Sequence, residues 1–170
     1  TSKGVFFSLG DLPEAARKPG PERDALLLRV IGSPDPYGKH TDGMGGATSS
    51  TSKTVILAKS DKPDHDVDYL FGQVSIDKPF VDWSGNCGNL SAAVGAFAVS
   101  NGLVDPARIP ENGVCAVRVW QKNIGKTGWM MKIRMFPHHI LRENPLASGA
   151  GADRMSTGMK CSFGKPIGIA

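Results

Sequence analysis

The sequence predicts an α+β fold, and three patterns lead to this class. Four short apolar runs have the length and composition of β-strands, at residues 5–9, 54–58, 69–76 and 113–121. Two segments repeat apolar residues at helical spacing, at residues 22–31 and 90–99. Turns rich in Gly and Pro separate these segments. A chain of 170 residues suits one domain and is long enough to bury a real core.

The first elements alternate with turns that contain proline and glycine. Residues 5–9 form an apolar run that is typical of a strand. A helix is expected over residues 22–31, because Pro21 suits a first helical turn and Gly32 suits a helix end. Residues 33–38 hold two prolines and a glycine, which excludes a regular element there.

The later elements follow the same logic. The strand at 69–76 comes after a polar segment, and the helix at 90–99 is followed by Asn101–Gly102, a typical stop signal. Residues 113–121 alternate in polarity, as a strand with one buried face does. Cys115 falls on the apolar positions of that alternation and is expected to be a small core residue.

A turn of Gly, Ser and Asn that contains a cysteine comes directly before the second helix. We expect Ser84 and Asn86 to cap this helix, so that Cys87 lies at its N-terminus. Unpaired backbone N–H groups there favour negative charge, which lowers the pKa of a thiol and also forms a seat for a carboxylate. A buried structural thiol is the alternative reading. Gly85 and Gly88 favour close approach of the backbone to another group, and both readings stay open.

Residues 42–53 form a second candidate for anion binding. Five hydroxyl side chains and three glycines precede Lys53, which directly adjoins a predicted strand. The segment is not a Walker A loop, because Ser52 stands where that motif requires Gly, and Lys126–Thr127 fails because Trp120 replaces the first Gly. A flexible linker is the alternative, although a lysine tied to a strand argues against it.

Composition and charge limit the compartment and the partners. The three cysteines Cys87, Cys115 and Cys161 show no paired spacing, which favours a reducing compartment. The chain shows no apolar run of membrane-spanning length and no signal peptide, so we expect a cytoplasmic protein with no membrane partner. Residues 1–127 hold 14 basic and 14 acidic side chains, so we expect no nucleic-acid partner.

The acidic segment 64–68 looks like a metal site at first sight. The EF-hand pattern fails, however, because Tyr69 stands at the required Gly and Ser75 at the required Glu. We expect a polar entry to the next strand and no bound metal.

Residues 128–170 differ from the rest of the chain. They contain the whole basic excess and five of the six methionines, and residues 148–170 show neither a helical nor a strand period. We interpret this tail as disordered or non-native sequence.

Several segments resemble one family: Thr-Ser-Lys-Gly at 1–4, Val-Ile-Gly-Ser-Pro-Asp-Pro-Tyr-Gly-Lys at 30–39, Asp-Gly-Met-Gly-Gly-Ala-Thr-Ser-Ser-Thr-Ser-Lys at 42–53, Asp-His-Asp-Val-Asp-Tyr-Leu-Phe-Gly-Gln-Val at 64–74, Val-Asp-Trp-Ser-Gly-Asn-Cys-Gly-Asn-Leu at 81–90 and Trp-Gln-Lys-Asn-Ile-Gly-Lys-Thr at 120–127. With these motifs the chain resembles the PrpF family, 2-methylaconitate cis-trans isomerases of the methylcitrate cycle in propionate catabolism. The resemblance covers residues 1–127.

The resemblance implies a diaminopimelate epimerase-like fold of two halves. Each half would be an antiparallel sheet rolled around a central helix, with the active site in the cleft between the halves. Residues 1–127 would form the N-terminal half of this two-domain isomerase, and residues 128–170 an unrecognised tail.

The resemblance also implies the site and its ligand. Lys53 and Cys87 are the candidate residues for proton transfer, with no cofactor and no metal. Either Lys53 is the base, or it is a cationic clamp while Cys87 acts as the acid or base. The partner is a small tricarboxylate substrate, and a homodimer is left open. The residues expected to bind the substrate are Thr1, Ser2, Lys3, Gly45, Gly46, Ser84, Gly85, Asn86, Gly88 and Asn89.

The expected activity is conversion of trans-2-methylaconitate into its cis isomer by abstraction and return of a proton. A related isomerase of unsaturated polycarboxylates, acting on aconitate, methylitaconate or oxalomesaconate, is one alternative. The other is an inactive structural or anion-binding half, because the second half of the family's fold is not recognised here.

Overall fold

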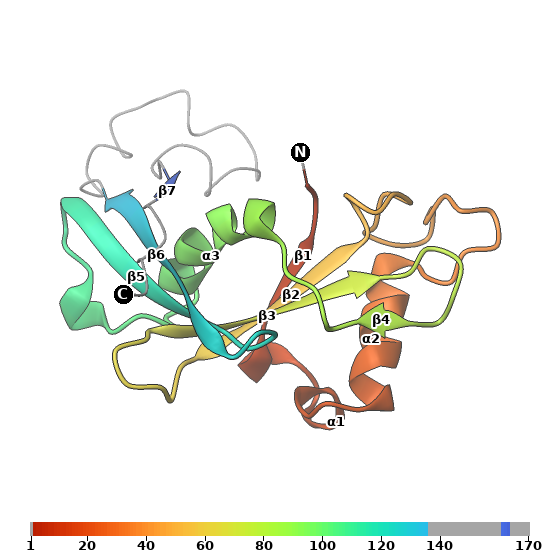
Figure 1. The fold of residues 1–170 in the computed structure, drawn as a ribbon, viewed down its shortest axis with the longest axis horizontal. Helices are drawn as coiled ribbons and strands as arrows, with labels where there is room; N and C mark the ends of the chain where they lie inside the picture. The colour runs from red at the N-terminus through yellow and green to blue at the C-terminus, as the bar shows by residue number, and fades with distance from the viewer. Residues whose placement is uncertain (1, 136–160, 164–170) are drawn as a thin grey trace, which may run out of the picture.

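The computed structural model describes residues 2–135 and 161–163 (Figure 1). The predicted strands and helices are all present, with boundaries close to those expected. The helices are α1 Glu14–Arg17, α2 Pro21–Ile31 and α3 Gly88–Ser100, with the 3₁₀ turns η1 Leu9–Asp11 and η2 Pro106–Arg108. The strands are β1 Val5–Ser8, β2 Lys53–Lys59, β3 Val67–Val74, β4 Val81–Asp82, β5 Gly113–Gln121, β6 Lys126–Met135 and β7 Cys161–Phe163.

The strands form one sheet in the order β1-β2-β3-β5-β6-β7, with β4 paired to β3. The expectation of an antiparallel sheet is wrong in two places, because β1 pairs with β2, and β3 with β5, in parallel. Parallel neighbours need a long crossover connection, usually through a helix. Here α2 lies between β1 and β2 in the chain, and α3 lies between β3 and β5, so the sheet is mixed.

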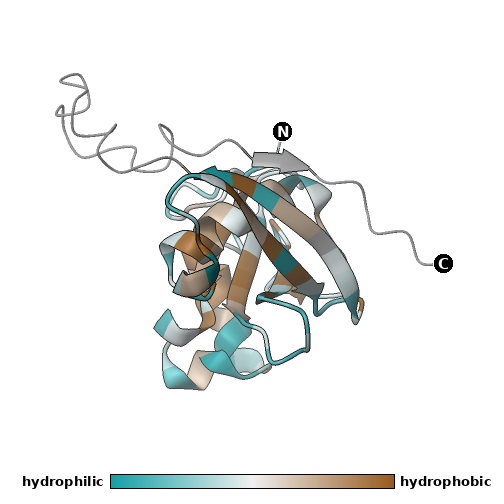
Figure 2. Ribbon diagram, turned by 90° about the vertical axis from the view of Figure 1, so that its left-hand side faces the viewer, coloured by the Kyte–Doolittle hydropathy of each residue, from teal (hydrophilic) through white to brown (hydrophobic). Residues whose placement is uncertain are grey.

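The sheet is covered on both faces. Alternate residues of β2 point to opposite faces, and Val55 and Leu57 belong to the same buried cluster as α3. Ile56, between them, instead packs with α1 and α2. The two groups of helices therefore lie on opposite faces of the sheet. Figure 2 shows the hydrophobic residues concentrated along the central strands and the hydrophilic residues in the outer loops.

Helix α3 packs closely on the sheet because its buried face is made of small and medium apolar residues. Leu90, Val94 and Ala98 are buried in the main core cluster. Gly95 lies so close to β6 that a Cβ atom there would come within 2.6 Å of the Ile133 side chain. This contact fixes the height of α3 over the sheet, and with it the position of the loop that precedes the helix.

The division expected at Thr127 falls inside β6. This strand runs on to Met135, with Met131 and Ile133 buried and Lys132 exposed. The alternation of apolar and basic residues from 131 to 134 was the available signal for this strand. Beyond Met135 only the backbone of β7, which pairs with β6, belongs to the described residues. The expectation of disorder for 136–160 and 164–170 concerns residues outside them.

Among residues 2–135 and 161–163, no helix combines the length and the apolar character that a membrane crossing requires.

Candidate active site

Cys87 lies at the N-cap of α3, one residue before the first helical residue Gly88. The backbone N–H of Cys87 donates to the Asn86 side chain at 2.8 Å, and Cys87, rather than Ser84 or Asn86, is the N-cap residue. The prediction that Ser84 and Asn86 cap α3 is therefore wrong. Ser84 instead bonds Asp82 through both its backbone N–H and its hydroxyl. The side chains of Asp82 and Asn86 accept hydrogen bonds within the loop, from Ser84 and Cys87, and not from the first N–H groups of the helix.

Lys53 is the first residue of β2, and its amine reaches Cys87 from the neighbouring strand. The Lys53 Nζ atom donates to the Cys87 sulfur at 3.4 Å. The backbone before Lys53 is anchored to β3, because the Ser52 carbonyl oxygen accepts from the Val74 backbone N–H and from the Gln73 side chain. The structure thus brings together the two residues expected to transfer protons.

The surroundings of Cys87 favour the thiolate. The residue is 6% exposed, and this burial by itself raises the pKa of the thiol. The backbone N–H of Leu90, the charge and hydrogen bond of Lys53 and the hydroxyl of Ser2 lower the pKa by more, so that the net shift is downward. A helix start and a neighbouring lysine are surroundings that lower the pKa of a thiol and activate cysteines.

A buried tyrosine, Tyr69, contacts the backbone of Cys87. The Tyr69 hydroxyl donates to the backbone carbonyl oxygen of Cys87 at 3.1 Å. Burial and the negative charge on Cys87 raise the pKa of Tyr69, so the hydroxyl keeps its proton and remains a donor. The sequence pattern gave no signal for this contact, because strand periodicity shows which face a side chain is on but not what it meets there.

Ser2 and Asn89 complete the contacts around the sulfur. The Ser2 hydroxyl oxygen lies 4.0 Å from the Cys87 sulfur and accepts from the Asn89 side-chain amide at 3.3 Å. Lys3 donates instead to the Gly45 carbonyl oxygen at 3.2 Å. Thr1, which was also expected at this site, lies outside the described residues.

The loop that leads into α3 presents polar groups to the surface. Asn86, Gly88 and Asn89 are exposed, and Gly85 is half-buried against the ring of Phe71. The first backbone N–H groups of a helix have no partner within the helix. The Gly88 and Asn89 N–H groups belong to this first turn, directly after Cys87.

The glycine-rich segment 42–53 folds back onto the end of α2. The Gly45 N–H, expected to hold a carboxylate, donates to the Ile31 carbonyl oxygen at 3.0 Å. Glycine is needed at Gly45 because a Cβ would come within 2.4 Å of the His40 ring, and at Gly46 because it would meet Thr51 at 2.6 Å. Both positions thus have a packing reason to be glycine.

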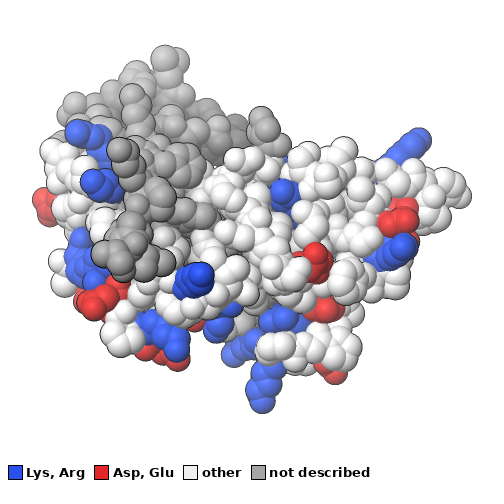
Figure 3. All heavy atoms as spheres, in the orientation of Figure 1, with Lys and Arg blue, Asp and Glu red and all other residues white. Residues whose placement is uncertain are grey.

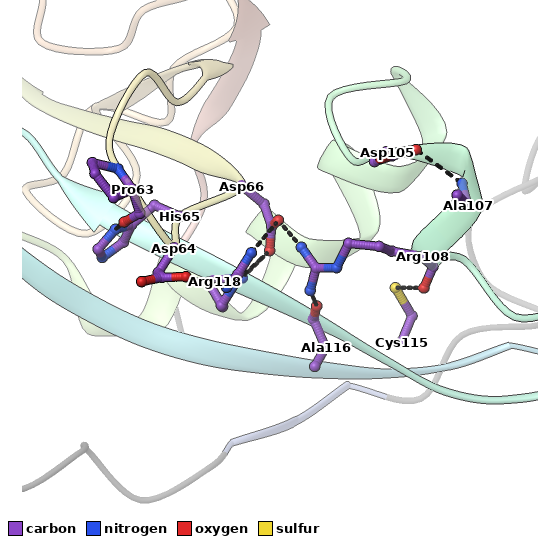
Figure 4. Close-up of polar contacts among 10 residues, drawn as sticks. All are labelled: Pro63, Asp64, His65, Asp66, Asp105, Ala107, Arg108, Cys115, Ala116 and Arg118. Carbon is purple, nitrogen blue, oxygen red and sulfur yellow. Dashed lines mark hydrogen bonds and ion pairs between the residues drawn. The ribbon is translucent and has the colours of Figure 1, made fainter.

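The acidic segment 64–68 forms ion pairs (Figure 4). Asp66 is buried and accepts hydrogen bonds from the side chains of Arg108 and Arg118. Asp68, also buried, pairs with Lys122 at 3.2 Å. These carboxylates hold the end of β3 against β5, and no cluster of metal-ligating side chains occurs in the described part of the chain.

A hollow on the surface lies apart from this site. The hollow, of about 720 Å³, opens beside the loop after α2, and none of the predicted site residues lines it. Its lining is formed by Arg29, Gly32, Pro34, Asp35, Pro36, Tyr37, Lys39, Thr41 and Asp42. On the face drawn in Figure 3, basic and acidic side chains of the described residues are interspersed.

Comparisons with known proteins agree with the resemblance found in the sequence. A family model described as "PrpF protein" matches residues 1–133. Over 127 residues the chain is 84% identical to a 2-methyl-aconitate isomerase of Shewanella oneidensis and 81% identical to one of Cupriavidus necator. Each match covers 75% of this chain and 32% of the relative, so the chain spans about a third of the length of these curated relatives.

The fold is also similar to a solved structure. The crystal structure of a methylitaconate-delta-isomerase matches with a TM-score of 0.66 and 39% sequence identity, over 79% of this chain and 55% of that chain. From the family match over residues 1–133 and these similarities, the chain belongs to the PrpF family.

Proposed function

We propose that this chain carries the catalytic pair, Lys53 and Cys87, of an isomerase that converts trans-2-methylaconitate into the cis isomer. The observation that carries the proposal is the 3.4 Å contact between the Lys53 amine and the Cys87 sulfur. The identities of 84% and 81% to two 2-methyl-aconitate isomerases support this substrate.

The proposed reaction uses the pair in two different roles. Isomerisation requires that a proton leave the carbon next to the double bond and return to the conjugated system. Cys87, whose lowered pKa favours the thiolate, takes and returns this proton. Lys53 remains protonated and stabilises the negative charge that spreads into the dienolate intermediate. General acid–base catalysis of this kind contributes about 10²–10⁴-fold to a rate.

The exposed start of α3 holds a substrate carboxylate in this proposal. The N–H groups of Gly88 and Asn89 lie at the positive end of the helix dipole, which attracts carboxylates. Asn89 and Ser2, already hydrogen-bonded to each other, add two side chains that can bond a second carboxylate oxygen.

The chain supplies one part of the enzyme in this proposal. It spans 32% of the length of the 2-methyl-aconitate isomerases, so the rest of the protein is expected to close the site over the Lys53–Cys87 pair. The finer fold that we propose is an epimerase-like half, with the sheet rolled around α3, and the packing of α3 on the sheet supports it. A catalytic thiolate also needs a reducing compartment, which supports placement in the cytoplasm.

A second candidate is an isomerase of methylitaconate or another unsaturated polycarboxylate. The structural similarity to a methylitaconate-delta-isomerase favours it, because the same pair and the same carboxylate seat would serve both skeletons. The identity of 39% to that protein, against 84% and 81% over the matched segments of the two relatives, places this candidate second.

The test grafts residues 1–127 of this chain into the Shewanella oneidensis relative, in place of the matched segment. The grafted enzyme is expected to convert trans-2-methylaconitate faster than 3-methylitaconate. The opposite preference would support the second candidate, and no turnover of either compound would contradict both.

The 170-residue chain is assayed in parallel. Absence of turnover, with trans-aconitate still slowing the alkylation of Cys87, is expected for a binding half that lacks the rest of its site. Alkylation that trans-aconitate does not slow would contradict the proposed carboxylate seat.

A further inference from the structure

Strands β4 and β5 pair with different residues of β3 and leave a gap between the two pairings. Residues 67–69 of β3 pair with β5, whereas Gln73 and Val74 pair with β4. Phe71 lies between these two ladders. A backbone N–H and a carbonyl group inside a sheet need partners, because leaving such groups unpaired in a buried place is costly.

The side chain of Asn123 fills this gap. Its Oδ1 atom accepts from the Phe71 N–H at 2.8 Å, and its Nδ2 atom donates to the Phe71 carbonyl oxygen at 2.7 Å. A carboxamide has the same donor and acceptor groups as a peptide unit. Asn123, in the turn between β5 and β6, therefore completes the ladder of β3 in place of a strand.

A third bond connects Asn123 to the loop that carries Cys87. The Nδ2 atom also donates to the Trp83 carbonyl oxygen at 2.7 Å. An amide nitrogen has two hydrogens, so these two bonds use its full donor capacity. Trp83 directly follows β4 and is the first residue of the loop that ends at Cys87.

Phe71 is itself in contact with both sides of the site. The Lys53 amine lies over the Phe71 ring, 5.7 Å from its centroid. A Cβ atom at Gly85 would lie 3.5 Å from the same ring. Asn123 therefore holds the backbone of a residue that supports Lys53, and it also holds the start of the loop that delivers Cys87.

The indole of Trp83 has its own anchors in α2. The Arg23 guanidinium stacks on the ring at 4.1 Å, and the ring N–H donates to Asp24 at 3.1 Å. The side chain of Trp83 is thus held by α2, whereas its carbonyl group is held by Asn123.

We propose that Asn123 is a positioning residue, which fixes the loop from Trp83 to Cys87 so that the sulfur stays in contact with Lys53. The proposal rests on the proposed function in assigning that pair to catalysis. It goes beyond that function in naming the residue outside the site on which the geometry of the pair depends.

The test uses the full 170-residue chain and two readouts that do not require turnover. The first is the pH dependence of Cys87 alkylation by iodoacetamide, followed by mass spectrometry of the peptide that contains Cys87. The second is amide hydrogen exchange of residues 83–89. In Asn123→Ala the alkylation midpoint is expected to rise by about half a pH unit or more, since loss of a favourable charge contact shifts a pKa upward. Exchange of 83–89 is expected to become faster.

Asn101→Ala is the matched control. Asn101 also donates its side-chain amide to a backbone carbonyl, that of Phe97 at 2.8 Å, but at the opposite end of α3. This variant is expected to leave the midpoint and the exchange of 83–89 unchanged. Where Asn123→Ala does not fold, Asn123→Gln is used, because it keeps the amide and displaces it by one methylene group. The same changes are expected there.

An unchanged midpoint together with unchanged exchange in a folded Asn123 variant would overturn the proposal, as would equal changes in Asn101→Ala. Lys53→Met tests the charge coupling of the pair separately from the positioning by Asn123. If it leaves the midpoint unchanged, the charge coupling assumed in the proposed function is wrong. The exchange of residues 83–89 in the Asn123 variants still decides whether Asn123 fixes the loop.

Discussion

The hydroxyl of Tyr69 donates a hydrogen bond to the backbone carbonyl oxygen of Cys87, and it does so from a side chain that is fully buried. This bond joins the middle of the sheet to the N-cap of α3. Cys87 is thus held from β3 through its backbone and from β2 through its sulfur, which accepts from Lys53.

Removing the Tyr69 hydroxyl is expected to destabilise the fold modestly. Tyr69→Phe deletes the hydrogen bond to the Cys87 carbonyl oxygen and keeps the ring, which costs about 1 kcal/mol of the free energy of unfolding. Urea unfolding followed by circular dichroism measures this change. Tyr37→Phe is the control, because Tyr37 is 83% exposed and its substitution is expected to leave the midpoint unchanged. Equal midpoints for both variants would show that the Tyr69–Cys87 bond adds no stability.

Cys87 and Cys115 are expected to react in a fixed order. Burial raises the pKa of Cys115, whereas Lys53, Ser2 and the Leu90 N–H bring the pKa of Cys87 below its ordinary value despite burial. Iodoacetamide near neutral pH is therefore expected to modify Cys87 first, as read by mass spectrometry of the separate peptides. Faster modification of Cys115 would contradict this assignment of charge.

The same shift predicts a dependence of stability on pH. The folded state holds the proton of Cys87 less tightly than the unfolded state, whose thiol has an ordinary pKa of about 9. Stability from this group is present above pH 9 and is lost as the pH falls through the lowered pKa of the folded state. The free energy of unfolding is thus expected to rise with pH in that window. Cys87→Ser should remove this rise, and a variant that keeps it would show that another group is responsible.

The close contact of Gly95 with β6 gives a packing prediction. In Gly95→Ala the new methyl group meets the Ile133 side chain at 2.6 Å and Met131 at 3.1 Å. Overpacking costs about 1–3 kcal/mol, and the better helix propensity of Ala returns about 1 kcal/mol. Thermal unfolding should show a net loss. Gly88→Ala in the same helix has no atom within 4 Å of the new methyl group and should show none.

The ion pairs beside β3 give a prediction that compares a buried and an exposed carboxylate. Asp66 bonds Arg108 and Arg118 with its side chain 6% exposed, whereas the side chain of Asp64 is 91% exposed. Asp66→Asn is expected to cost about 1–3 kcal/mol of the free energy of unfolding. This is less than the loss for a fully buried ion pair, because both arginines reach water. Asp64→Asn should cost less than about 0.5 kcal/mol. Chemical unfolding measures both, and similar losses would contradict the buried ion pair.

Local patterns in the sequence predicted the elements well but not their pairing. Helix α3 followed from the spacing of Leu90, Val94 and Phe97, and β5 from its alternation. The parallel pairing of β1 with β2 could not be predicted from periodicity, because it depends on where α2 crosses the sheet. Strand order is set by packing between distant segments, to which a local pattern is blind.

The candidate site, too, was predicted only in part by local patterns. The position of Cys87 at a helix start followed from the turn residues before it, although the cap predicted at Ser84 and Asn86 was wrong. The contact between Lys53 and Cys87 joins residues 34 positions apart, and only the family resemblance pointed to it. No pattern pointed to Asn123, because its role depends on a gap in a sheet that exists only after folding.

In the proposed reaction, Lys53 and Cys87 act together on the substrate's proton. Its most direct test measures deuterium uptake from D₂O into 2-methylaconitate by the relative that carries residues 1–127 of this chain. Unmodified, the grafted enzyme is expected to incorporate deuterium during isomerisation. In Cys87→Ser and in Lys53→Met the rates of deuterium uptake and of isomerisation should both fall by about 10²-fold or more. Deuterium uptake and isomerisation at the unmodified rate in either variant would show that the substituted residue takes no part in the proton transfer.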